Sequence, residues 1–401
     1  MKSEFNRFDY FIIFLIASLA FGAIGGSLQV VRLLTIIFFP TFFRRFVFHS
    51  AFYGSYVNCV IVFLLYASIS LFWTPDRGEG LKELFYFFVH FLAFFEILVF
   101  SKYARKPLES IPIGWLVSVS MTLVVAMWEI TTDQHLQWSR MDSDTKLNIG
   151  SEIILRRFAA VTFYNYNGYV TFLCFALPFV LFFLLKPGRT YKNSFIPIIA
   201  VLLSAVCILI NASRGGLLTL ILMSIFLFRH YGVKRLISRS SIMLIGLSAY
   251  VAYRFGNIIS LVIGVRAEHG IVNPEEGRLV IWQNVLRAFS QTYGLGTGIG
   301  GIAKEMSNVT MGILVPHNIF LEILLEFGVL FFIVFVLFYV QTLKKILFNP
   351  NSIYKSMLLM ALIPFPIYTI INSRYLLSPY VFIAFASLIV FINHERFRPI
   401  C

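Results

Sequence analysis

Three basic residues could together bind and activate a phosphorylated substrate. Arg214 lies in NASRGGLL, Arg278 in EEGRLVIW, and His317 in VPHNIFLEILLEFG. Arginine can bind phosphate oxygens through two parallel hydrogen bonds, and histidine can accept a proton from a hydroxyl near neutral pH. Two guanidinium groups and one imidazole therefore suit a substrate that contains a pyrophosphate and a hydroxyl to be activated.

Each of these residues also has a structural interpretation. Arg214 could extend to lipid headgroups at a helix end. Arg278 could pair with one of the two glutamates before it, and His317 could be an interfacial residue at the start of a helix. The two glycines after Arg214 favour a binding role, because they let a ligand or another helix approach the backbone closely.

A glycine run, YGLGTGIGG at 293–301, contains the pattern G-x-G-x-x-G of dinucleotide-binding turns. The pattern indicates a nucleotide site only between a strand and a helix. Here it follows an amphipathic helical pattern. We therefore predict a flexible bend that folds back toward the His317 segment, with backbone N–H groups available to the phosphates of a ligand.

The elements that must position these residues are membrane helices. Of the 401 residues, 59% are hydrophobic and 13% are charged, and 45 are phenylalanine. Soluble domains have about 45–50% apolar and about 25% charged residues. We predict an all-α polytopic integral membrane protein, one membrane domain over 1–401, with about twelve spans of roughly 20 residues each. The expected spans are 10–26, 29–43, 54–74, 82–101, 111–130, 161–185, 194–211, 214–229, 241–254, 317–342, 354–372 and 376–393.

The net charge of +14 follows this topology. Lysine and arginine concentrate in alternate loops, which the positive-inside rule assigns to the cytoplasm together with both termini. The opposite loops hold most of the acidic residues outside the spans. The basic balance therefore does not indicate nucleic-acid binding, and Arg214, Arg278 and His317 all fall at the outer boundary.

Two outer loops are long enough to be functional, at 131–160 and at 255–316. The second is expected to carry part of the active site. It contains a helical pattern from Arg278 onward, in which Leu279, Trp282, Leu286 and Phe289 recur at spacings of three and four. We expect a helix at or near the outer surface that ends before the glycine run.

Other kinds of site have little support in the sequence. The cysteines do not form a disulfide framework, no cluster has metal-ligand spacing, and we predict neither a metal nor a cofactor. Glu96 and Glu129, in or at the end of spans, could be ion or proton sites, which leaves a membrane transporter as an alternative. Glu326 is expected to pair with another span.

Four segments resemble, in this order, the O-antigen ligase/polymerase superfamily. They are TFYNYNGYVTFLCFALPF at 162–179, SRGGLL at 213–218, GRLVIWQNVLRAFSQTYGLGTGIG at 277–300 and HNIFLEILLEFG at 317–328. The first matches loosely, since Tyr166 stands where the family has proline, and Asn167 matches the second asparagine. The order and spacing of all four carry the resemblance, which covers the second half of the chain.

The resemblance implies a multi-span glycosyltransferase of the GT-C type that takes a glycan from undecaprenyl pyrophosphate at the periplasmic face of the bacterial inner membrane, without a metal or nucleotide. It assigns donor binding to Arg214 and Arg278, matches His317 and Asn318 to the family's His-Asn pair, and leaves Arg157 and Arg374 as further phosphate-binding candidates. In this interpretation His317 orients or deprotonates the acceptor hydroxyl for one inverting displacement.

Two acceptors fit the resemblance. In a ligase the glycan passes to lipid A-core, and in a polymerase it passes to a second lipid-linked repeat unit. Family ligases often have Gly, Thr or Tyr three residues after Gly328, whereas this chain has Phe331, which weakens the ligase assignment relative to the polymerase. We expect a ligase, with the polymerase as the alternative.

Overall fold

The structure, a computed structural model, is almost entirely helical over the residues that it describes, which are 4–46, 53–139, 146–149, 152–155, 158–185, 191–231, 278–310, 314–348 and 352–397. One short antiparallel hairpin, β1 (Lys146–Ile149) and β2 (Glu152–Leu155), lies within the predicted loop at 131–160.

The helices follow one another along the chain with short connections. They are α1 (Arg7–Ala17), α2 (Val30–Phe43), α3 (Gly54–Ser70), α4 (Arg77–Tyr103), α5 (Pro107–Thr132), α6 (Tyr166–Leu185), α7 (Tyr191–Ile210), α8 (Arg214–Tyr231), α11 (Arg278–Ser290), α12 (Ile302–Val309), α13 (Ile319–Leu347), α14 (Ser352–Leu362), α15 (Phe365–Tyr368) and α16 (Pro379–Ile392), with 3₁₀ turns η1 (Ser18–Phe21), η2 (Gly26–Leu28), η5 (Tyr375–Leu377) and η6 (His394–Phe397).

Four of the described helices, α4, α5, α6 and α13, are long and apolar enough to cross a membrane. Six shorter apolar helices accompany them. The membrane character of the chain is thereby supported, whereas the count of twelve spans stays a prediction. The expected span at 241–254 lies outside the described residues.

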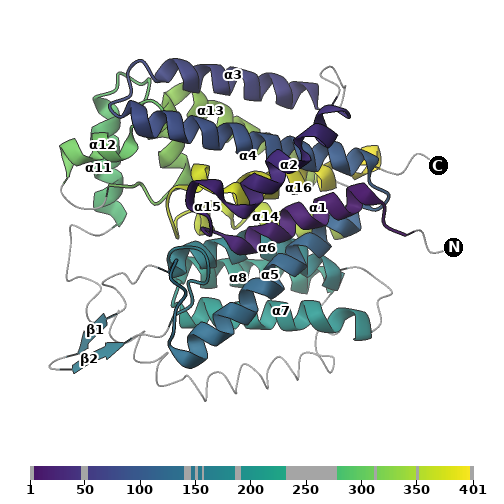
Figure 1. Cartoon of the computed structure of the whole chain (residues 1–401). Coiled ribbons are helices and arrows are strands. Elements are labelled where there is room, and N and C mark those ends of the chain that lie inside the picture. The colour runs from purple at the N-terminus through teal and green to yellow at the C-terminus, as the bar shows by residue number, and fades with distance from the viewer. Residues whose placement is uncertain are drawn as a thin grey trace.

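The helices pack side by side, and α6 lies near the centre of the bundle, where most of its side chains are buried (Figure 1). The side chain of Asn6, which caps α1, donates from Nδ2 to the carbonyl oxygen of Tyr103 at the end of α4, 2.9 Å away. The start of α1 and the end of α4 therefore meet at one end of the bundle, and α11 and α12 lie at the opposite end (Figure 1).

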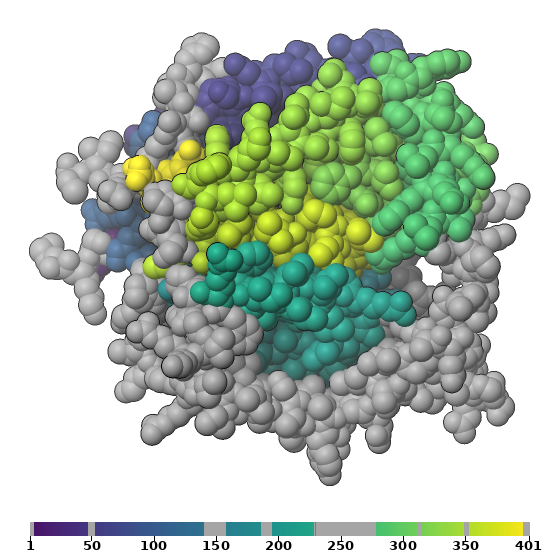
Figure 2. Space-filling view, turned by 180° about the vertical axis from the view of Figure 1, so that it is seen from behind, coloured from purple at the N-terminus to yellow at the C-terminus, as the bar shows by residue number. Residues whose placement is uncertain are grey.

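Seen from the other side, α13 forms a broad surface above α8, with the C-terminal helices between them (Figure 2). Much of its side is exposed, including Leu330, Val334 and Leu337. In a membrane protein such an apolar surface faces lipid, so the long exposed flank of α13 agrees with its expected role as a span.

Two predicted details of these elements are wrong. The first expected span, at 10–26, is the short helix α1 followed by two 3₁₀ turns, because glycines interrupt it. The helix from Arg278 exists, but its buried side is formed by Ile281, Val285 and Ala288, whereas Leu279 and Leu286 are exposed. Apolar side chains stand on both sides of this helix, so spacing alone did not identify the packed side.

Candidate active site

Arg214 is the first residue of α8, and its side chain is exposed. In the described part of the chain it makes no hydrogen bond or ion pair. A β-carbon at Gly215 would lie 2.8 Å from Cγ1 of Ile371, and one at Gly216 would lie 2.7 Å from Cγ1 of Val170. Both glycines are therefore needed for close packing, and they bring Arg214 beside the segment that contains Ile371.

That segment, residues 369–375, connects α15 to η5 and is the part of the chain to which the site residues converge. Arg278, at the start of α11, donates from its guanidinium to the carbonyl oxygens of Ile370 and Ile371. Arg214 and Arg278, which are far apart in sequence, are thus brought to one backbone segment. The shared segment supports the predicted grouping of the two arginines.

The start of α6 reaches the same segment. A β-carbon at Gly168 would lie 3.4 Å from Nδ2 of Asn372. The side chain of Asn165 accepts the backbone N–H of Gly168 at 2.7 Å and stabilises the first turn of the helix. Asn167, the second residue of α6, is half-buried and therefore lies near Asn372.

His317 precedes α13 and is not part of that helix, as had been expected. Its φ angle is +50°, a left-handed conformation that is uncommon for a residue other than glycine. Asn318 is the N-cap, and its Oδ1 accepts the backbone N–H groups of Phe320 and Leu321. The cap fixes the direction of the chain at His317.

The electrostatic environment keeps the imidazole of His317 neutral. Burial, and then the nearby Arg278 guanidinium, lower its pKa from 6.5 to about 4. Its Nδ1 atom is buried and has no hydrogen-bond partner among the described residues. At pH 7 the ring is therefore uncharged and can accept a proton.

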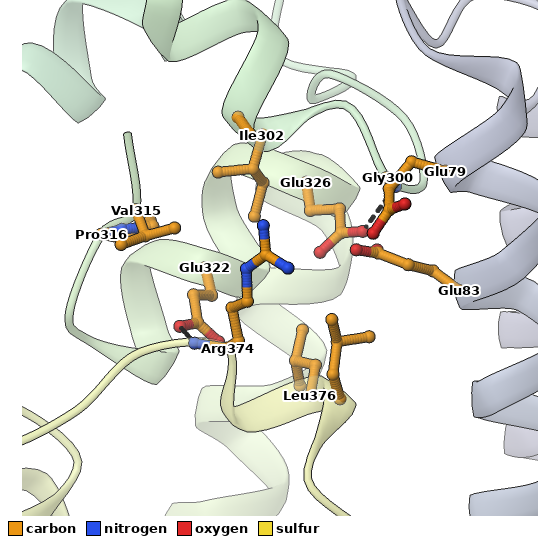
Figure 3. A pocket seen from close by; sticks show the side chains of 12 residues that line it. Glu79, Glu83, Gly300, Ile302, Val315, Pro316, Glu322, Glu326, Arg374 and Leu376 are labelled. Carbon is orange, nitrogen blue, oxygen red and sulfur yellow. Dashed lines mark hydrogen bonds between the residues drawn. The ribbon is translucent and has the colours of Figure 1, made fainter. Parts of the chain in front are cut away.

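Arg374 has a left-handed backbone conformation, with φ at +57°. The buried carboxylate of Glu322, on α13, accepts the backbone N–H groups of Arg374 and Tyr375. The Arg374 side chain extends into a pocket bounded by α4, α12, α13 and η5 (Figure 3). The motif containing His317 thus also fixes the backbone of Arg374.

The pocket is strongly acidic. Four carboxylates line it together with Arg374 and the backbone around Pro316; they belong to Glu79, Glu83, Glu322 and Glu326. Glu83 on α4 is hydrogen-bonded to Glu326 on α13, which confirms the predicted pairing of Glu326 with another span. Because carboxylates repel phosphate, this pocket is less suitable for a pyrophosphate than the side of the site that holds Arg214 and Arg278.

An apolar groove adjoins the pocket and shares Leu376 with it. It has a volume of about 510 Å³ and lies between α3, α4, α13 and α16. Phenylalanines dominate its wall, among them Phe63, Phe327 and Phe382. An acidic pocket and an aromatic groove thus meet within one side of the bundle.

The glycine run bends back onto α13, as predicted. Four of its glycines have φ angles between +72° and +82°. The N–H groups of Thr297 and Gly298 donate to the carbonyl oxygens of Leu325 and Glu326, and the N–H of Gly300 donates to the Glu326 carboxylate. The expectation that these N–H groups would be available to phosphates is wrong at these positions, because the protein itself uses them.

Sequence reasoning found the arginines and the histidine but not what joins them. It considered Glu322 only as a residue near His317, and it did not consider Asn372. A glutamate one helical turn below a motif histidine, and polar residues in the short connection before the last helix, were the available signals. Arg157 lies outside the described residues.

The family comparison covers the part of the chain that holds the three central residues. Residues 199–336 match a family model described as O-antigen ligase. This segment is an O-antigen ligase domain. The match includes Arg214, Arg278 and His317, and it confirms the predicted resemblance to the O-antigen ligase/polymerase superfamily.

The O-antigen ligase domain covers about a third of the chain, and the 369–375 segment lies beyond it. No curated protein matches the sequence. The family indicates a membrane glycosyltransferase that acts on lipid-linked glycan and polysaccharide substrates.

Proposed function

We propose that the protein is an O-antigen ligase-type glycosyltransferase that moves a glycan from undecaprenyl pyrophosphate to a hydroxyl of lipid A-core. The observation that carries the proposal is the convergence of Arg214, Arg278 and His317 on one segment beside the matched domain. Arg214 is exposed and bears a charge that no described side chain neutralises, as a residue that binds an anionic donor requires.

The roles follow from charge and protonation. Arg214 and Arg278 bind the pyrophosphate of the donor and stabilise the charge that develops on it as the glycosidic bond breaks. Neutral His317 accepts the proton of the acceptor hydroxyl, whose oxygen attacks the anomeric carbon from the opposite face and inverts its configuration. The reaction as proposed needs no metal.

The proposed location of the donor lipid uses the apolar groove. The polyprenyl chain would lie among the phenylalanines between α4 and α13, where apolar contact replaces contact with bilayer lipid. The site would face the periplasm of the inner membrane, with both termini in the cytoplasm, as the distribution of basic residues requires. The start of α1 and the arginine site lie at opposite ends of the bundle, in support of this orientation (Figure 1).

The alternative is a polymerase that transfers the glycan to a second lipid-linked repeat unit. Phe331 favours it, since ligases often carry a smaller or hydroxyl-bearing residue there. In this structure the ring lies 4.6 Å from the Tyr66 ring and 5.5 Å from the Phe63 ring, so it forms part of the groove wall. A transporter has less support, because the arginines and the histidine gather at one end of the bundle.

The test uses a deletion strain that expresses single variants. Arg214→Ala, Arg278→Ala and His317→Ala should each abolish glycan transfer while the protein remains in the membrane. Arg214→Lys keeps the charge but loses bidentate geometry and should give reduced transfer. Near-normal transfer by His317→Ala would exclude its role as base. In the deletion strain, intact lipid-linked polymer with no attachment to lipid A-core indicates a ligase, and single-repeat decoration indicates a polymerase.

A further inference from the structure

The 369–375 segment connects the candidate site residues, and one carboxylate controls its shape. It accepts hydrogen bonds from Arg278, it packs against Gly215 next to Arg214, and it lies beside the start of α6. The segment lies outside the matched domain, and none of its contacts to these elements depends on its own charged side chains.

The segment has its own internal bonds, but they do not fix its last two residues. The hydroxyl of Tyr375 accepts the N–H of Asn372 at 2.7 Å and donates to the carbonyl oxygen of Tyr368 at 3.1 Å. The N–H groups of Arg374 and Tyr375 instead point to α13. Both are bound by Glu322, whose Oε2 lies 2.9 Å from the nitrogen of Tyr375.

Glu322 stabilises a backbone conformation that would otherwise be unfavourable. Arg374 is in the left-handed region, which costs a residue with a side chain about 1–2 kcal/mol. A carboxylate that accepts two consecutive N–H groups compensates for this cost, and hydrogen bonds to a charged acceptor are stronger than those to a neutral one. Glu322 is 2% exposed, so water does not replace it.

We propose that Glu322 is a positioning residue for glycan transfer, which holds the 369–375 segment so that Ile370 and Ile371 can orient Arg278 for the donor. This inference rests on the proposed function, since Arg278 is taken there as a pyrophosphate ligand. Glu322 itself does not touch the substrate. It acts through two backbone carbonyl groups and the arginine that they orient.

The central test is Glu322→Gln, with Glu326→Gln as its matched control. Glutamine has one acceptor oxygen and a donor NH₂, so at position 322 it can satisfy one of the two N–H groups and opposes the other. Glu326 is on the same helix one turn further along, is equally buried, and binds Gly300 in place of the 369–375 segment. Glutamine can replace its bonds to Gly300 and Glu83.

The expected result is a loss that is specific to the donor. In purified protein, Glu322→Gln should lower kcat/KM for the lipid-linked donor about tenfold or more and leave KM for the acceptor within twofold. Glu326→Gln should leave both within twofold. Equal losses in the two variants, or a donor kcat/KM within twofold of wild type for Glu322→Gln, would overturn the proposal.

A second measurement separates positioning from a general loss of packing. Asparagine tolerates the left-handed conformation better than arginine, so Arg374→Asn removes part of what Glu322 compensates. The loss caused by Glu322→Gln should therefore be at least threefold smaller in the Arg374→Asn background than in wild type. An equal loss in both backgrounds would show that Glu322 does not act through the conformation of residue 374.

Amide hydrogen exchange tests the inference without any transfer assay. The amides of Arg374 and Tyr375 should exchange faster in Glu322→Gln than in Glu326→Gln, and unchanged exchange would overturn the positioning role. A wild-type protein that transfers no glycan would instead overturn the proposed function. If Glu322→Gln does not accumulate in the membrane, Glu322→Asp, which keeps both oxygens on a shorter chain, should give an intermediate loss of transfer, and full transfer would contradict the proposal.

Discussion

The glycine run at 293–301 and the 369–375 segment are both fixed by carboxylates of α13, one helical turn apart, yet their contacts differ. Glu326 binds the N–H of Gly300, and the carbonyl oxygens near the kink of α13 bind Thr297 and Gly298. Glu322 binds Arg374 and Tyr375. The glycine run joins α13 to α3 and α4, whereas the 369–375 segment joins α13 to the arginines.

This difference indicates separate roles for the two segments. The glycine run carries the conspicuous sequence pattern, but its contacts are with the helix scaffold: the side chain of Thr74 donates to Ile299, and that of Tyr66 donates to Leu295. The 369–375 segment has no recognisable pattern, but it contacts Arg278 and the start of α8. We therefore expect changes in the first to alter stability, and changes in the second to alter transfer.

The largest effect should come from breaking the contact between the glycine run and the kink of α13. Gly328 has φ at +77°, and a β-carbon there would lie 2.4 Å from the carbonyl oxygen of Gly294. Gly328→Ala should therefore cost roughly 2–5 kcal/mol, the sum of a left-handed alanine and an overpacked contact. Thermal unfolding in detergent should show the loss, while transfer per folded molecule stays near that of wild type.

Gly26→Ala is the control for this substitution. Gly26 also has a left-handed φ, at +58°, but no atom lies within 4 Å of a β-carbon placed there. It should cost about 1–2 kcal/mol, from conformation alone. A Gly328→Ala protein as stable as Gly26→Ala would show that the glycine run does not press against the kink.

A smaller effect should separate the two segments through the same substitution in each. Tyr375→Phe removes a hydroxyl that binds Asn372 and Tyr368, and Tyr66→Phe removes one that lies 2.6 Å from the carbonyl oxygen of Leu295 in the glycine run. Each should lower the free energy of unfolding by about 1 kcal/mol, the net value of a typical hydrogen bond.

Glycan transfer should distinguish the two variants. Tyr375→Phe should reduce the rate per folded molecule several-fold, because the segment that orients Arg278 loses an internal bond. Tyr66→Phe should leave this rate within twofold of wild type. If the two rates fall equally, the glycine run also controls the site, and the comparison between the segments is wrong.

The sequence predicted which residues form the site better than it predicted what holds them together. Arg214, Arg278 and His317 stand in motifs with recognisable order and spacing, and the charge pattern placed all three at one membrane boundary. The bonds of Glu322 to Arg374 and Tyr375 are long-range contacts between a helix side chain and backbone N–H groups. Backbone groups leave no residue-type signal, so such a contact could not be predicted.

The same limit explains the errors in local structure. The helix at Arg278 was predicted from its periodicity, but its packed side depends on α12 and α13, whose positions periodicity does not give. Glycine suits both a phosphate-binding turn and close backbone packing. The glycine run was therefore placed correctly and given the wrong hydrogen-bond partners.

The smallest expected effect concerns pH and also depends on which segment is changed. Because the pKa of His317 is lowered to about 4, the folded protein takes up this proton well below pH 6.5, the ordinary value for histidine. The stabilising contribution is complete above pH 6.5 and is lost as the pH falls to about 4. For the same reason, kcat/KM should be constant with respect to this group from pH 6 to 8 and should fall as the pH drops through about 4.

Arg278 is the second cause of this shift after burial, and the 369–375 segment orients Arg278. Loosening that segment with Tyr375→Phe should weaken the repulsion between guanidinium and imidazolium, raise the pKa of His317 slightly, and move the acid limb of kcat/KM to higher pH. Tyr66→Phe should leave the limb where wild type has it. Profiles of kcat/KM between pH 3.5 and 8 would measure both. A wild-type limb near 6.5 would mean that His317 is not buried against Arg278, and equal shifts in the two variants would mean that the glycine run and the 369–375 segment act on the imidazole alike.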